Sequence, residues 1–165
     1  MAIKVGALYH FTDRRNLTSI KQMGGLFSWA KLREMDLKVD VPGGNDWSHD
    51  ADLYKGLDRY VHLCFRMNHP MEYAARKDGR INESTFLQID PRVLDKNGVL
   101  FTDDVSNKAG VQIYTLDQAA DIIDFEVLHT TPNWSDEEFK KRIRKVEKCE
   151  ILVPDFVSID LIRNL

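Results

Sequence analysis

The sequence has little of what usually identifies a secreted, membrane-bound or zinc-binding protein. It contains only two cysteines, Cys64 and Cys149, far apart and in apolar surroundings. Their number excludes a disulfide framework and a Cys-rich zinc site, and it predicts two buried, reduced thiols. No window approaches the roughly 18 apolar residues of a membrane span, and the N-terminal MAIKVGALYHF lacks the apolar core of a signal peptide. We therefore expect a cytoplasmic protein that does not cross a membrane.

An excess of charge of one sign is also missing. The chain has 23 Lys and Arg against 26 Asp and Glu, a net charge of −3. This balance excludes a histone-like polycation but leaves room for a local basic groove. The 165 residues are 43% hydrophobic and 30% charged, which suffices for one core without cross-links. We expect a single domain over residues 1–165.

Common catalytic and cofactor motifs are absent as well. No GxxxxGK[ST] run exists, so Gly43-Gly44 is interpreted as a loop turn and not as a phosphate-binding loop. There is no GxSxG and no Rossmann fingerprint, and none of the five histidines stands in an HxH or HExxH spacing. Asp46, His49 and Asp50 form a weak metal candidate, which a solvated loop explains better. We expect no metal.

What the sequence does contain is a mixture of strand and helix patterns. Alternation and apolar runs predict strands over 3–9, 59–66, 84–89, 98–102 and 149–153, with a last extended piece over 157–162. Capping residues predict helices that begin at Asp13, at His69-Pro70, at Asp117 and at the capping box Ser135–Glu138; the first ends at Gly24-Gly25 and the second at Gly79. Because no βαβ regularity appears, we expect an α+β fold with two small sheets packed together and flanking helices.

A polar loop and a basic helix are candidates for contact with a ligand. Residues 38–58 are rich in Gly, Asp and Asn and predict a long surface loop, which is typically functional or mobile. Residues 140–148 of the last predicted helix carry six Lys or Arg and one Glu, a local charge of +5. They form either a solvated helix face or a groove that tracks phosphates, with Trp29 or Trp47 stacking on a base.

Two further features carry more specific chemistry. Residues 9–12, Tyr-His-Phe-Thr, leave an apolar strand just before a capped helix, a place that suits binding of an anion or a ribose. A structural histidine at a strand end explains His10 equally well. Glu150 begins an apolar strand directly after the basic helix, where a carboxylate can be held firmly. The alternative is a strand-edge glutamate paired with Lys148 or Arg144.

Taken together, four segments resemble the DarT family, bacterial ADP-ribosyltransferases that use NAD to modify bases in single-stranded DNA. YHFTDRRNLTSIKQMGGL is similar to the family's N-terminal strand, YHxT turn and first helix. LDRYVHLCFRMNHPMEY is similar to its DYVPFYFxPRSPMLY segment, VLFTDDVSNKAG to its FVFTD turn, and KCEILVPDFVSIDLI to its QAEFLV strand and the tail after it. The four occur in the family's order and span nearly the whole chain.

The resemblance implies a fold and a site. The fold is that of the ADP-ribosyltransferases, a split β-sandwich core with NAD in the cleft between its sheets. Glu150 is then the catalytic glutamate and His10 lies against the NAD ribose, with Thr12 in the same turn. Tyr73 and the strand through Phe65 wall the nicotinamide side.

The chain also departs from the family pattern. The family places an arginine after its first helix to hold the NAD phosphates and assist catalysis; here there is no IQxRR-like run, and the role is carried over to Arg33, with Lys31 nearby. The family's PRSP segment reads Asn68-His69-Pro70, preceded by Arg66-Met67, and Cys64 replaces the tyrosine of its FYF strand.

The function implied by the resemblance is NAD-dependent ADP-ribosylation of a nucleobase in single-stranded DNA, as the toxin of a toxin–antitoxin or phage-defence pair with a macrodomain antitoxin. A carboxylate beside the ribose stabilises the oxocarbenium-like transition state and can remove a proton from a base nitrogen. Modification of RNA or protein, or plain NAD hydrolysis, is the first alternative. A non-catalytic module that binds a nucleotide or nucleic acid is the second.

Overall fold

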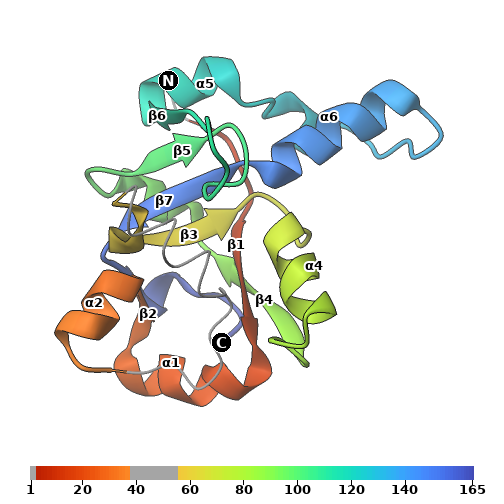
Figure 1. Cartoon of the computed structure of the whole chain (residues 1–165). Coiled ribbons are helices and arrows are strands. Elements are labelled where there is room, and N and C mark those ends of the chain that lie inside the picture. The colour runs from red at the N-terminus through yellow and green to blue at the C-terminus, as the bar shows by residue number, and fades with distance from the viewer. Residues whose placement is uncertain (1–2, 38–55) are drawn as a thin grey trace.

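The computed structural model describes residues 3–37 and 56–165, which form two antiparallel sheets with helices around them (Figure 1). The larger sheet has six strands in the order β4-β1-β3-β7-β5-β6, and the smaller pairs β2 with β8. The strands are β1 (Leu8–Asp13), β2 (Gly25–Phe27), β3 (Tyr60–Cys64), β4 (Ser84–Ile89), β5 (Leu100–Thr102), β6 (Ile113–Thr115), β7 (Glu150–Pro154) and β8 (Phe156–Ser158). The expected α+β fold with two sheets is confirmed, although one sheet is larger than expected.

The helices are grouped at the two ends of the larger sheet. They are α1 (Leu17–Met23), α2 (Trp29–Glu34), α4 (Pro70–Lys77), α5 (Leu116–Ile122) and α6 (Glu137–Lys148), with 3-10 turns at Arg14–Asn16, Leu57–Arg59, Pro91–Asp95, Glu126–His129 and Ile159–Leu161. In Figure 1, α1 and α2 lie with β2 at one end, α5 and α6 lie at the other, and α4 lies beside β1. None of the described helices is long and apolar enough to cross a membrane.

The core lies on β1, β3, β5 and β7. Leu8, Leu63, Phe101, Ile151 and Val153 are all at most 1% exposed, and each such side chain contributes roughly 1.5–3 kcal/mol relative to an exposed one. Both cysteines are buried and free, as expected. Burial raises the pKa of the Cys149 thiol to about 12, so it stays protonated at neutral pH.

The turn after β1 is fixed by Asp13. Its carboxylate accepts hydrogen bonds from the side chain of Arg15 and from the amides of Arg15, Asn82 and Glu83. The Arg15 guanidinium and these amides hold the pKa of the Asp13 carboxyl well below its usual range. Asp13 therefore joins the start of the first helical segment to the segment that leads into β4, and its predicted capping role is confirmed.

Two glycines shape the passage from α1 into β2 of the smaller sheet. Gly24 ends α1 in the left-handed conformation, with φ 82°, as the sequence predicts. A Cβ on Gly25 would lie 2.1 Å from the carbonyl oxygen of Val157 in β8, so only glycine permits this close pairing of β2 with β8.

Three predicted boundaries were wrong. The first strand runs over 8–13 and not over 3–9, because residues 8–13 pair one by one with β4. Helix α5 is capped by Thr115, which forms a capping box with Gln118, because the backbone turns there, two residues before Asp117. Helix α6 is capped by Asp136, which accepts from the amide of Glu138, whereas the Ser135 hydroxyl donates to Asn133.

Most of the predicted loop over 38–58 lies outside the described residues. This applies to Gly43-Gly44, to Trp47 and to the weak metal candidate Asp46, His49 and Asp50. Its last residues lead into the 3-10 turn at Leu57–Arg59, directly before β3.

Candidate active site

Glu150 is the first residue of β7 and directly follows α6. Its Cα is paired with that of Cys64 in β3, and its amide donates a hydrogen bond of 2.9 Å to the hydroxyl of Thr102 in β5. The residue is 5% exposed. Strand pairing on both sides therefore fixes the backbone from which this carboxylate projects.

The carboxylate of Glu150 is surrounded by donors from three other segments. Its Oε1 lies 2.9 Å from Nδ1 of His62 in β3 and accepts from the Ser106 hydroxyl at 3.0 Å. Its Oε2 accepts from the Ser106 amide at 2.7 Å and lies 3.6 Å from Nε2 of His69. The alternative of a strand-edge glutamate paired with Lys148 or Arg144 is wrong, because β7 lies inside the sheet and the partners are His62 and Ser106.

These donors set the charge state of Glu150. Burial raises the pKa of the Glu150 carboxyl, but the hydrogen bond and charge of His62 and the hydrogen bond of the Ser106 amide outweigh burial and hold the pKa below its ordinary value. The site therefore contains a buried carboxylate that is ionised at neutral pH.

His10 lies on β1, which neighbours β3 in the sheet. Its Nδ1 is 2.9 Å from the carbonyl oxygen of His62. Burial lowers the pKa of the His10 imidazole, more than this hydrogen bond raises it. Because a carbonyl only accepts, the neutral ring carries its proton on Nδ1 and leaves Nε2 as an acceptor. His62 thus stands between His10 and Glu150.

Thr12 is part of β1 and not of the turn after it, which corrects its predicted position. It is paired with Thr85, and its hydroxyl accepts from the side-chain amide of Asn16 at 3.0 Å. Strand alternation places Thr12 on the same face of β1 as His10. Contact of Thr12 with NAD stays a prediction.

The two aromatic residues expected beside the nicotinamide lie in different environments. Phe65 is 3% exposed, and its ring packs in the core against Phe101 and Phe125. Tyr73 on α4 is 57% exposed, with Arg76 5.8 Å from its ring centroid. Contact with the nicotinamide stays a prediction for both, and the burial of Phe65 does not favour it.

Arg33 lies on α2 and forms an ion pair with the buried Asp58. Asp58 follows Leu57, whose carbonyl oxygen lies 3.0 Å from Nε2 of His62. Arg33 is therefore connected to the Glu150 carboxylate through the 3-10 turn before β3. Lys31 is paired with Glu34 on the outer side of α2.

Sequence reasoning missed His62, His69 and Ser106. They come from β3, from the N-cap of α4 and from the segment between β5 and β6. For two of them the sequence held an indication: both are histidines at positions where the quoted family segment has another residue, a proline at His62 and a serine at His69. Ser106 had no such signal, because its role depends on a backbone amide.

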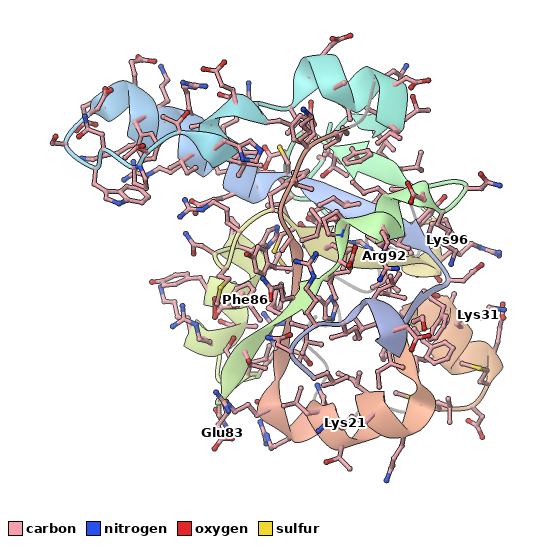
Figure 2. All side chains as sticks on the ribbon, turned by 180° about the vertical axis from the view of Figure 1, so that it is seen from behind. Lys21, Lys31, Glu83, Phe86, Arg92 and Lys96 are labelled. Carbon is pink, nitrogen blue, oxygen red and sulfur yellow. The ribbon has the colours of Figure 1, made fainter. Side chains whose placement is uncertain are left out.

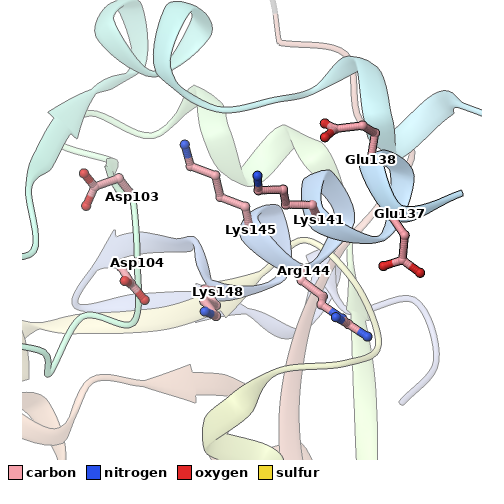
Figure 3. Close-up of a pocket in the computed structure, with 8 residues that line it drawn as sticks. All are labelled: Asp103, Asp104, Glu137, Glu138, Lys141, Arg144, Lys145 and Lys148. Carbon is pink, nitrogen blue, oxygen red and sulfur yellow. The ribbon is translucent and has the colours of Figure 1, made fainter.

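One cavity of the described structure is separate from the Glu150 site. It has a volume of about 580 Å³ and lies between α6 and the start of the β5–β6 connection, so Glu150 does not line it (Figure 3). Its lining residues are Asp103, Asp104, Glu137, Glu138, Lys141, Arg144, Lys145 and Lys148. Four of the basic residues predicted to track phosphates thus gather on one side of α6, together with four acidic residues.

Comparison with known proteins identifies the family. The family model described as "ssDNA thymidine ADP-ribosyltransferase, DarT" matches residues 9–165. The chain belongs to the DarT family. It is accordingly an NAD-dependent ADP-ribosyltransferase, which the sequence predicts. No curated protein matches the sequence closely enough to be compared with it.

Solved DarT structures share the fold. Thermus sp. 2.9 DarT in complex with ADP-ribosylated ssDNA is 19% identical, with a TM-score of 0.70 over 98% of this chain and 82% of that one. The same protein in complex with NAD+ gives 0.65 at 19% identity over 99% and 82%. Thermosipho africanus DarTG in complex with ADP-ribose gives 0.70 at 20% identity over 95% of this chain and 42% of that one.

Within residues 3–37 and 56–165, no group of three or more His, Cys, Asp or Glu side chains is arranged to hold a metal ion. Two of the residues that the resemblance singles out are an ionised carboxylate, Glu150 on β7, and a neutral imidazole, His10 on β1, and His62 on the intervening strand β3 contacts both.

Proposed function

We propose that this chain transfers ADP-ribose from NAD to a thymidine base in single-stranded DNA, with Glu150 as the catalytic carboxylate. The observation that carries the proposal is the state of Glu150: it is buried, ionised and held by Ser106 and His62. His62 lies on β3, between Glu150 on β7 and His10 on β1. The family description supports the substrate, because it names thymidine in single-stranded DNA.

The chemistry requires one carboxylate to act twice. The bond between nicotinamide and the ribose C1′ breaks, and nicotinamide leaves with the electron pair. The positive charge left on the ribose is stabilised by Glu150 next to the 2′-hydroxyl. A ring nitrogen of the base then bonds to C1′, and its proton passes to Glu150 as general base.

In this proposal His10 binds a ribose of NAD and Arg33 binds its diphosphate. Nε2 of His10 accepts a hydrogen bond from a ribose hydroxyl, because Nδ1 is already used at the carbonyl of His62. Arg33 keeps its ion pair with Asp58 and directs its remaining N–H groups to the diphosphate. Thr12 lies on the face of β1 that carries His10, within reach of the same ribose.

The DNA follows the basic side of α6. Lys141, Arg144, Lys145 and Lys148 line one cavity, and α6 ends two residues before Glu150. A single strand held there presents an unpaired base to the site without the cost of opening a duplex. The protein acts in the cytoplasm as a toxin, and a macrodomain partner that removes the mark restrains it.

Incubation with labelled NAD and matched samples of single-stranded DNA, duplex DNA, RNA and protein tests the proposal. We expect mass spectrometry to find ADP-ribose on thymidine in single-stranded DNA. We expect Glu150→Gln to fold but lose about 1,000-fold or more in kcat, whereas Glu83→Gln, an exposed glutamate directly before β4 and remote from α6 (Figure 2), keeps full activity. His10→Ala should chiefly weaken NAD binding.

Two results would contradict the proposal. Release of free ADP-ribose with no labelled polymer would identify an NAD glycohydrolase. Turnover by Glu150→Gln within about twofold of the native rate would remove Glu150 from the mechanism.

A further inference from the structure

His62 occupies the middle of β3, between the strands that carry His10 and Glu150. Three of its polar atoms have partners: Nδ1 is 2.9 Å from Glu150 Oε1, Nε2 is 3.0 Å from the Leu57 carbonyl oxygen, and its own carbonyl oxygen is 2.9 Å from Nδ1 of His10. The ring is 24% exposed. One residue therefore contacts both proposed reactive groups.

The partners of the ring determine its protonation state. The Leu57 carbonyl can only accept, so Nε2 carries a proton. The ionised Glu150 oxygen also accepts, so Nδ1 carries a proton as well. The Ser106 hydroxyl, 3.2 Å from Nδ1, donates its hydrogen to Glu150 Oε1. Only the imidazolium form of His62 satisfies both contacts.

Three described titratable groups near His62, besides Glu150, are neutral. His69, from the N-cap of α4, accepts from the Met71 amide through Nδ1, and burial lowers the pKa of its ring. His10, from β1, is neutral for the same reason. Burial and the nearby Glu150 raise the pKa of the Cys64 thiol, so it is uncharged too. Among the described residues, the cluster thus pairs one cation with one anion.

We infer that His62 is a positioning residue for this reaction: its imidazolium fixes the orientation of the Glu150 carboxylate and keeps it ionised, while its carbonyl fixes the tautomer of His10. The inference rests on the proposed function of Glu150. The strand position of Glu150 fixes only its backbone, whereas the ion pair with His62 fixes the orientation and the charge of its carboxylate.

Two substitutions separate the charge of His62 from its hydrogen bond. His62→Asn keeps a donor at the position of Nδ1 but cannot titrate, whereas His62→Phe fills the space without a donor. The matched control is His129→Asn, because His129 is an exposed histidine whose Nε2 lies 2.7 Å from the Lys4 carbonyl oxygen. Melting temperatures establish that each variant is folded.

We expect His62→Phe to lower kcat about 100-fold, since a misplaced reactive group costs about this much, and to move the acid limb of the pH–kcat profile to higher pH. His62→Asn, which keeps a hydrogen-bond donor but not the charge, should lose less activity than His62→Phe, and its acid limb should also move to higher pH. His129→Asn should match the native profile.

Native kcat in His62→Phe, or equal losses and unchanged pH profiles in both variants, would overturn the inference. The proposed function fails separately. If Glu150→Gln is active, the catalytic assignment is wrong, whereas an inactive Glu150→Gln beside a fully active His62→Phe removes His62 alone.

Discussion

Ser106 holds both oxygens of Glu150, although the two residues are 44 positions apart in the chain. The Ser106 amide donates to Oε2 at 2.7 Å and its hydroxyl donates to Oε1 at 3.0 Å. Both residues are buried. The segment between β5 and β6 therefore forms one wall of the site, next to His62 on β3, whose Nδ1 lies 3.2 Å from the Ser106 hydroxyl.

Ser106→Ala removes one of these two bonds and keeps the other. A hydrogen bond to a charged group is worth about 1.5–3 kcal/mol, so we expect kcat to fall about 10- to 100-fold with little change in NAD affinity. Steady-state kinetics with a single-stranded oligonucleotide measure this. Ser135→Ala, which changes an exposed serine bonded to Asn133, is the control. An unchanged kcat in Ser106→Ala would show that the amide alone holds Glu150.

Much of the fold could be predicted because the spacing of apolar residues and the position of capping residues directly determine where helices and strands form. The spacing of Phe139, Ile143 and Val146 predicts one buried helix face, and all three are buried. Pro70 after His69 predicts a helix start, and α4 begins there. In contrast, β2 and β6 have three residues each, too few for a periodicity to be visible. They form because each pairs with another strand, β2 with β8 and β6 with β5.

The candidate site could be predicted only in part, for a related reason. Glu150 and His10 follow local patterns, a carboxylate at the start of a buried strand and a histidine before a capped helix. The neighbours that set their charge states, His62 and Ser106, become relevant only through strand order and a long connection. No local spacing indicates that order, so the ion pair had to be found in three dimensions.

Acidification should destabilise the protein before Glu150 is protonated. Burial lowers the pKa of His10 and of His69 below 6.5 in the folded chain, so the unfolded chain binds more protons as the pH falls. The stability that these two neutral histidines contribute is therefore fully present above about pH 6.5 and declines below it. We expect the melting temperature to fall between pH 7 and about pH 5.

One substitution isolates the contribution of His69 to this pH dependence. His69→Asn keeps a side-chain acceptor at the N-cap of α4 but cannot titrate. We expect its melting temperature to depend less steeply on pH than that of the native protein, as measured by circular dichroism from pH 5 to 8. Parallel curves for the two proteins would show that His69 is not a source of the acid sensitivity.

The pairing of β2 with β8 in the smaller sheet depends on Gly25. A methyl group there would lie 2.1 Å from the Val157 carbonyl oxygen, at a φ of 149° that side chains rarely adopt. We expect Gly25→Ala to destabilise the fold by about 2 kcal/mol or more, as strained backbone positions do. Gly6→Ala has open space around it and should be nearly neutral. Urea unfolding compares the two, and equal midpoints would mean that the small sheet tolerates a shift.

Binding of single-stranded DNA along α6 should depend steeply on salt. Each phosphate that a lysine neutralises contributes about −0.7 to the slope of log affinity against log salt for a single strand. We expect Lys145→Ala, in the cavity beside α6 (Figure 3), to weaken binding and to reduce that slope by about this amount.

Lys21→Ala is the control for the α6 path. Lys21 lies on α1, at the end of the molecule opposite α6 (Figure 2), so this change should leave both affinity and slope as they are. Fluorescence anisotropy with a thymidine-containing oligonucleotide at four salt concentrations measures both quantities. If Lys145→Ala and Lys21→Ala lose equal affinity, the strand follows another surface and α6 is only a solvated helix face.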